Sequence, residues 1–181
     1  MKIVFVSDIH GSTAGLARAL SFYDSVEADL LCLGGDIINY GPRNGLPESL
    51  DPAAVADLLN ARKRKIVAVR GNCDSEVDQM LLQFPALPDY AVVADGSRRF
   101  FLTHGHKFLA GGAAPWLEAD VVVSGHTHLW ELRRDERGIV WLNTGSVTFP
   151  KQGRMPTFGY YDGSSLAIVG LDGQSLAQMR L

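Results

Sequence analysis

Aspartate and histidine residues gather in five short clusters, and these residues have the types and spacing that could do chemistry. The clusters are Asp8-x-His10, Gly35-Asp36, Gly71-Asn72-Cys73-Asp74, His104-x-His106 and Gly125-His126-x-His128. They contain all five histidines of the chain. Carboxylates, imidazoles and a carboxamide form a nitrogen and oxygen ligand set that suits manganese, iron, zinc or cobalt. The clusters therefore predict a metal site, provided that they meet in space.

Each cluster alone has an ordinary explanation. Asp8 could cap a helix, Asp36 could begin a turn, and Asn72 could adopt a left-handed turn after a glycine. His126 and His128 are harder to explain in this way, because residues i and i+2 of an extended segment point to the same side and can bind one metal. The recurrence of such clusters in one chain favours ligands.

The elements that must position these clusters are short apolar segments that directly precede them. Residues 2–7, 30–33, 65–70 and 120–124 are rich in Val, Ile and Leu, which is typical of strands buried on both faces. Helical patterns lie between the first three, over residues 12–24 and from Asp51-Pro52 onward. This order predicts a βαβαβ beginning. In open α/β sheets the loops at the carboxyl ends of the strands meet in one crevice, so we expect the clusters to converge.

From about residue 90 the pattern changes to short strands separated by turns. Residues 90–94 and 99–103, and residues 130–134 and 139–143, are predicted to form hairpins, and the tail is predicted to form an antiparallel meander. No repeat or linker separates the two halves. We therefore expect one α/β domain over residues 1–181.

The composition excludes several classes of protein. The net charge of −3 provides no positive field for a long nucleic acid. Two cysteines do not make a disulfide framework, and the first apolar segment is too short for a signal peptide or a membrane span. We expect a cytoplasmic protein with no membrane segment. The segment over residues 111–116 is interpreted as a flexible loop, in which Trp116 lines the pocket or contacts another subunit of a homo-oligomer.

The ordered set of clusters resembles the calcineurin-like metallophosphoesterase superfamily. Residues 38–44, 69–80, 102–106 and 143–150 closely resemble the small bacterial phosphodiesterases of the YfcE type, and the similarity extends over essentially the whole chain. This resemblance implies a four-layer α/β/β/α sandwich with mixed sheets and a dinuclear metal centre at the sheet edge.

The resemblance also implies which residues bind the two divalent metals. Asp8, His10, Asp36 and His128 would hold one ion, and Asp36, Asn72, His104 and His126 the other, with Asp36 as the bridge. Manganese is the expected metal, with iron, zinc, cobalt and nickel as alternatives. The implied reaction is hydrolysis of small phosphodiesters by in-line attack of a metal-bridging hydroxide, since two close metals can activate a shared water and polarise the phosphoryl oxygens.

One position departs from the superfamily. Many relatives have a histidine where this chain has Cys73. That histidine is thought to protonate the leaving oxygen or stabilise phosphate charge, and a general acid contributes roughly 10²–10⁴-fold to a rate. A neutral thiol does not replace a cation, so we expect diesters to be cleaved better than dianionic monoesters.

The remaining candidates have weaker patterns. The resemblance makes Asn72, Cys73, Asp74, His104 and His106 candidate catalytic residues, and makes Asn39, Arg43, Cys73 and His106 candidates for substrate binding. Cys73 could instead be a plain buried thiol, Arg43 a surface arginine and His106 a structural hydrogen-bonding residue. Asp74 could hold the loop of Cys73, accept a hydrogen bond from a ligand imidazole, or cap a helix that begins near Glu76.

Two other functions remain open within this fold. One is a phosphomonoesterase or nucleotide hydrolase. The other is a non-catalytic protein-interaction scaffold, such as the retromer subunit that resembles these enzymes but lacks a full catalytic set. Because all seven ligand positions of this chain hold ligating residues, the sequence disfavours a scaffold.

Overall fold

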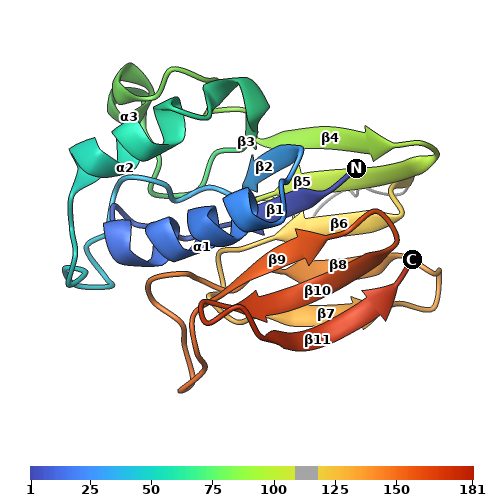
Figure 1. The fold of residues 1–181 in the computed structure, drawn as a ribbon. Coiled ribbons are helices and arrows are strands. Elements are labelled where there is room, and N and C mark those ends of the chain that lie inside the picture. The colour runs from blue at the N-terminus through green and yellow to red at the C-terminus, as the bar shows by residue number, and fades with distance from the viewer. Residues whose placement is uncertain (109–117) are drawn as a thin grey trace.

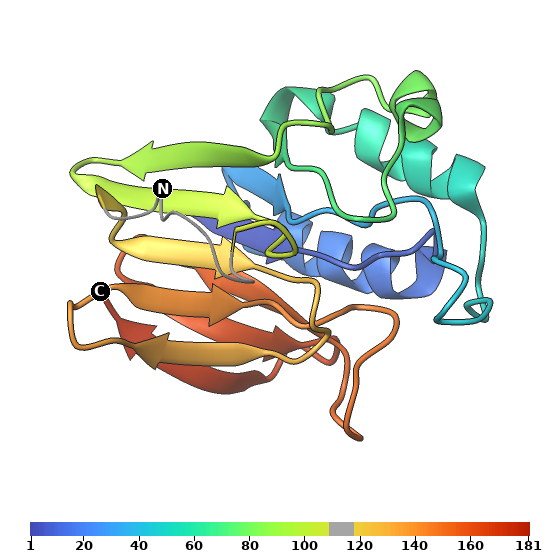
Figure 2. The ribbon, with the colours of Figure 1, turned by 180° about the vertical axis from the view of Figure 1, so that it is seen from behind.

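The structure, a computed structural model, describes residues 1–108 and 118–181, so the loop predicted over residues 111–116 lies outside the described residues. Two mixed sheets stack face to face (Figures 1 and 2). In spatial order the first consists of β11 (Ser175–Arg180), β10 (Ser165–Gly170), β9 (Thr157–Tyr161), β1 (Ile3–Val6), β2 (Leu30–Leu33) and β3 (Ile66–Ala68). The second consists of β4 (Tyr90–Asp95), β5 (Arg98–Thr103), β6 (Val121–Ser124), β8 (Val140–Asn143) and β7 (Glu131–Arg134).

The helices follow the predicted βαβαβ order. α1 (Thr13–Ser25) connects β1 to β2, and α2 (Pro52–Asn60) and the 3-10 turn η1 (Lys63–Lys65) precede β3. The three strands are parallel, so the predicted beginning is confirmed. Asp51 caps α2 by accepting a hydrogen bond from the backbone N–H of Ala54 at 2.9 Å, and Pro52 occupies the first turn. A shorter helix, α3 (Glu76–Leu81), follows β3.

Alternation of side chains along β1 produces two cores. Val4 and Val6 pack with α1 and α2 on the outer face of the first sheet, whereas Ile3 and Phe5 face the second sheet. The rings of Phe5 and Phe100 lie 5.9 Å apart between the sheets. Stacked mixed sheets with helices on an outer face confirm the predicted α/β class.

The second sheet confirms the predicted hairpins. β4 pairs antiparallel with β5, and β7 pairs antiparallel with β8, while β9, β10 and β11 form the predicted meander. β5, β6 and β8 are parallel to one another. The carboxyl ends of β1, β2, β5 and β6 lie at the same end of the two sheets, the left end in Figure 1. No helix in residues 1–108 or 118–181 is long and apolar enough to cross a membrane.

Candidate metal centre

Loops from both sheets meet at this edge and bring the predicted ligands together. Asp8 and His10 follow β1, Asp36 follows β2, Asn72 follows β3, His104 follows β5, and His126 and His128 follow β6. Of these seven, Asp8, His10, Asp36, His104 and His128 are buried, His126 is partly buried and Asn72 is exposed. A buried carboxylate or imidazole needs a partner, so this concentration of polar side chains requires an explanation.

Asp8, His10 and His128 form the first group. Their ligand atoms lie within 4.8 Å of one another. Nε2 of His128 is 3.1 Å from Oδ1 of Asp8 and 3.3 Å from Nε2 of His10. Burial alone would raise the pKa of Asp8, but His128 and His104 outweigh it and lower that pKa to about 2. The carboxylate is therefore ionised, as a metal ligand must be.

Asp36, His104 and Asn72 form the second group. Oδ2 of Asp36 is 3.5 Å from Nε2 of His104, which in turn is 3.2 Å from Oδ1 of Asn72. The same Asp36 oxygen is 3.8 Å from Nε2 of His10, so this carboxylate lies between the two groups. His126 is less closely placed: its ring centre is 5.1 Å from that of His104.

Three backbone carbonyls orient the buried imidazoles. Nδ1 of His10, His104 and His128 lies 2.9, 2.7 and 2.6 Å from the carbonyl oxygens of Asn39, Gly34 and Phe149 respectively. A carbonyl only accepts, so each Nδ1 donates a proton, and in the neutral ring, the form that binds a metal, each Nε2 is left with a lone pair. Histidines that bind metals are oriented in the same way by acceptors on their other nitrogen.

With neutral imidazoles, this arrangement brings several acceptor atoms close together. The Nε2 atoms of His10 and His128 face each other, and Oδ1 of Asp8 is buried and accepts no hydrogen bond from the described residues. Lone pairs at such distances repel unless a cation lies among them. The donor set is entirely nitrogen and oxygen. The residues therefore fit divalent metals of the kind that the sequence predicts.

Five of the ligand residues adopt an unusual backbone conformation. Asp8, His10, Asp36, His126 and His128 have φ between 52° and 68°, the left-handed region. This conformation costs a residue other than glycine roughly 1–2 kcal/mol, and such strain gathers at functional sites. It turns each side chain back toward the sheet edge immediately after its strand.

Two glycines make room for the carboxylates. A Cβ on Gly71 would collide with Asp36, and a Cβ on Gly125 would collide with the side chains of Ser7 and Asp8. Ser7 Oγ donates a hydrogen bond of 2.6 Å to Oδ2 of Asp8, which also accepts one from the backbone N–H of His126. Only the tertiary structure explains why these positions are glycine.

Asp74 is a positioning residue. The cap of α3 is Ser75, so the interpretation of Asp74 as a helix cap is wrong. Its buried carboxylate accepts hydrogen bonds from the backbone N–H groups of Asp36, Gly71 and Ile37, at 2.7, 2.7 and 2.8 Å. It accepts none from a ligand imidazole among the described residues. Burial and the nearby Asp36 raise its pKa to about 6, even though the three N–H groups act in the opposite direction.

Cys73 lies against the ligands. Its Sγ is within 4.8 Å of ligand atoms of His10 and Asp36, and its backbone N–H donates to Oδ1 of Asp36 at 2.8 Å. Burial, followed by the charge of Asp36, raises the pKa of the Cys73 thiol to about 12. The thiol is neutral at physiological pH and offers no positive charge to a substrate.

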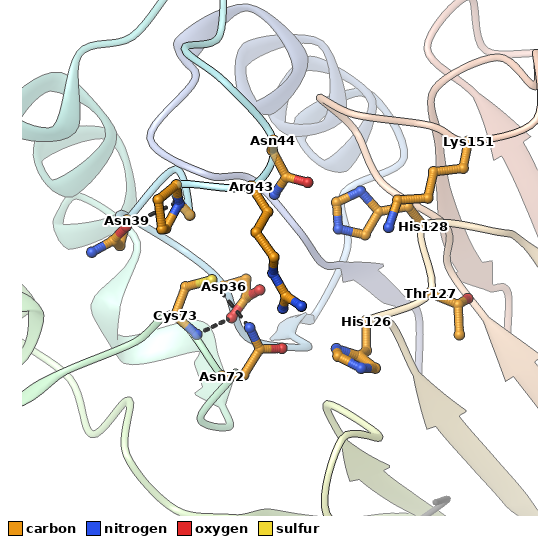
Figure 3. Close-up of a pocket in the computed structure, with 12 residues that line it drawn as sticks. Asp36, Asn39, Arg43, Asn44, Asn72, Cys73, His126, Thr127, His128 and Lys151 are labelled. Carbon is orange, nitrogen blue, oxygen red and sulfur yellow. Dashed lines mark hydrogen bonds between the residues drawn. The ribbon is translucent and has the colours of Figure 1, made fainter.

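A cavity opens beside the predicted ligands, and only some of the other predicted residues line it. Asn39 and Arg43 line it, together with Cys73 (Figure 3). His106 does not line it. The partly buried ring of His106 packs near His104 and His126, and its Nδ1 has no hydrogen-bond partner among the described residues. Burial, followed by those two histidines, lowers the pKa of His106 to about 4, so it is neutral at pH 7.

Sequence reasoning missed five residues that line the cavity: Gly41, Pro42, Asn44, Thr127 and Lys151. Lys151 directly follows the segment 143–150 that resembles known phosphodiesterases, but a lysine in a polar turn has no pattern of its own. Sequence reasoning also missed Ser146, which supports the loop behind His128. The cavity has a volume of about 720 Å³.

The fold and the site define a metal-binding protein of phosphoesterase type, and comparison with known proteins agrees. Residues 1–165 match the model of the calcineurin-like phosphoesterase superfamily domain. The chain therefore belongs to the calcineurin-like phosphoesterase superfamily.

Individual proteins of known structure or name are also similar to this chain. The chain is 45% identical to phosphodiesterase YfcE of Escherichia coli over 177 residues, which cover 97% of this chain and 95% of that protein. The solved structure of that phosphoesterase superimposes with a TM-score of 0.90 at 42% identity, covering 99% of both chains. Vps29 of Entamoeba histolytica, solved with Zn²⁺, has a TM-score of 0.64 at 21% identity and covers 100% of this chain and 98% of its own. That likeness shows the fold alone.

Proposed function

We propose that this protein is a metal-dependent phosphodiesterase that hydrolyses small phosphodiesters. The observation that carries the proposal is the convergence of Asp8, Asp36 and three oriented imidazoles on one centre rich in acceptor atoms. The 45% identity to a phosphodiesterase over nearly the whole chain supports the same activity.

The two groups of ligands suit two ions. Asp8, His10, Asp36 and His128 would hold one, and Asp36, Asn72, His104 and His126 the other. When bound, such a pair supplies an activated water for in-line attack and positive charge that polarises the phosphoryl oxygens. The protein contributes the fixed Nε2 lone pairs and two carboxylates, and because only two ligands are anionic the centre keeps a net positive charge. That charge attracts a phosphate ester.

The cavity supports a small substrate. Its volume of about 720 Å³ lies within the range of small-molecule sites. The net charge of −3 disfavours long nucleic acids. Arg43 reaches into the cavity toward Asp36, where its guanidinium can hold phosphoryl oxygens (Figure 3). We further propose Mn²⁺ as the metal and the cytoplasm as the compartment.

Cys73 favours diesters over monoesters. A monoester carries a second negative charge near neutral pH, and a cationic group at position 73 would stabilise it. The Cys73 thiol, with its pKa raised to about 12, stays uncharged. The diester, with one negative charge, needs less compensation.

The proposal is tested by removing and returning metal. The protein is treated with a chelator, desalted and assayed on bis-p-nitrophenyl phosphate with and without Mn²⁺. We expect no turnover without metal and restored turnover with Mn²⁺. Asp8→Asn should stay inactive in Mn²⁺, whereas Asp172→Asn, at an exposed turn, should behave as wild type.

Two outcomes would contradict the proposal. Absence of turnover after Mn²⁺ is returned would favour a scaffold. Turnover of p-nitrophenyl phosphate well above that of the diester would favour a monoesterase.

A further inference from the structure

Two cations point into the cavity from opposite walls. Arg43 comes from the loop between β2 and α2, and Lys151 from the loop between β8 and β9 (Figure 3). Neither side chain makes a hydrogen bond or an ion pair with the described residues. Asp36, a predicted metal ligand, is the only carboxylate that lines the cavity within the described part of the chain. The space beyond the metal centre is therefore positively charged.

Several other cations of this protein have partners. Lys107 pairs with Asp89, Arg62 pairs with Asp24 at 2.6 Å, and Arg154 lies over the ring of Trp130 at 4.9 Å. Arg43 and Lys151 differ from these three cations, because they share one cavity and have no partner among the described residues.

The structure holds Lys151 at this position. Its backbone N–H donates to the carbonyl of His128 at 3.2 Å, and its own carbonyl accepts from Arg154 at the same distance. Two residues earlier, the carbonyl of Phe149 orients the His128 ring. The loop that carries Lys151 is thus joined to His128 at two points, the backbone carbonyl and the ring, and the ammonium group of Lys151 lies beside that ring (Figure 3).

The two cations have different neighbours. The Arg43 guanidinium lies toward Asp36, Asn72 and His126, above the metal centre, whereas Lys151 lies at the exposed rim (Figure 3). A phosphodiester has one negative charge at phosphorus, which the centre and Arg43 can stabilise. With the phosphoryl group held there, Lys151 would be left to face an alcohol substituent of the ester.

We propose that Lys151 is a specificity residue that binds an anionic group, such as a carboxylate or a second phosphate, on an alcohol substituent of the diester. This inference rests on the proposed function. A substituent of that kind would pair with the one cation of the cavity that the phosphoryl group leaves free. A neutral substituent would gain nothing from it, and a cationic one would be repelled.

The test uses three p-nitrophenyl phosphodiesters that differ only in the second alcohol: glycolic acid, ethanol and choline. All three release the same chromophore, so kcat/KM values compare directly. For the Mn²⁺-loaded wild type we expect kcat/KM to be highest for the glycolate diester, lower for the ethyl diester and lowest for the choline diester. An exposed ion pair is worth up to about 1 kcal/mol, or roughly fivefold. In Lys151→Met the ratio of glycolate to ethyl kcat/KM should fall about fivefold.

Control variants separate charge from structure. Lys151→Arg should keep the ratio, because the charge is retained. Lys65→Met, an exposed lysine of η1 outside the cavity, should keep both the ratio and the rates. Calorimetric titration with non-hydrolysable phosphonate analogues of the glycolate and choline diesters gives the same comparison for binding alone. In this binding measurement too, the preference of the wild type for the glycolate analogue over the choline analogue should be lost in Lys151→Met.

An unchanged glycolate-to-ethyl ratio in Lys151→Met would overturn the inference and leave the proposed function standing, provided that bis-p-nitrophenyl phosphate is cleaved. An equal loss for all three diesters would also overturn it, because Lys151 would then serve the phosphoryl group. If wild type cleaves no diester in Mn²⁺, the proposed function fails and this inference fails with it.

Discussion

Ser146→Ala tests how the loop behind the metal centre is held. The Ser146 side chain is fully buried. Its hydroxyl donates to the backbone carbonyl of Asp8 at 2.8 Å and accepts from the N–H groups of Thr148 and Phe149 at 3.1 and 2.8 Å. This hydroxyl therefore connects the loop after β1, which carries Asp8 and His10, to the loop after β8, whose Phe149 carbonyl orients His128.

The loss of stability expected for Ser146→Ala follows from these three hydrogen bonds. Alanine removes only the oxygen, so no large cavity forms. It leaves one carbonyl and two N–H groups without their partner, and each such group costs about 1–3 kcal/mol when buried. The two N–H groups belong to partly buried bonds, so we take the lower end, about 1 kcal/mol for each group and about 3 kcal/mol in total. For a chain of this size that corresponds to a fall in Tm of roughly 6–12 °C.

The assay is thermal unfolding of metal-free protein, followed by circular dichroism. Ser25→Ala is the matched control, because its exposed hydroxyl makes one hydrogen bond of 2.8 Å to the carbonyl of Phe22. We expect that control to shift Tm by about 2 °C or less. If Ser146→Ala shifts Tm no more than Ser25→Ala does, the three bonds do not hold the loop and the reasoning is refuted.

Three further predictions concern single residues. Cys73→His should raise monoester turnover by at least about tenfold and diester turnover by less, because it restores a cationic group; a rise confined to diesters in the p-nitrophenyl assay would contradict this explanation. His126→Gly should be about 1 kcal/mol more stable than His126→Ala in urea unfolding of metal-free protein, because φ is 68° there; equal midpoints would show that the backbone is unstrained. Burial opposes ionisation of Asp135, but hydrogen bonds from Trp141, Arg137 and Ile139 lower its pKa to about 2. Its contribution to stability is therefore complete above pH ~4 and lost as the pH falls toward 2; an NMR titration midpoint near the ordinary aspartate value would disprove this.

Much of the fold could be predicted from the sequence, because its signals are local. The apolar runs at β1, β2 and β6 follow from composition over a few residues, and the Asp51-Pro52 start of α2 follows from helix-cap chemistry. The predicted start of the helix near Glu76 is confirmed, but its cap is Ser75 and not Asp74. Both residue types are good caps, and only the structure shows that the Asp74 carboxylate is already bonded to the loop after β2 and to Gly71.

By itself, the sequence determined the chemical identity of the ligands and their order along the chain, because residue type and spacing are local properties. Only the tertiary structure decided their orientation and the residues around them. Ser146 and Asp8 are 138 residues apart in the sequence, and yet the Ser146 hydroxyl donates a hydrogen bond to the carbonyl of Asp8. The left-handed backbone of Asp36, the carbonyl that orients His104 and the approach of Lys151 to His128 likewise depend on contacts between distant segments. Such contacts form when two sheets pack together, and no short stretch of residues encodes them.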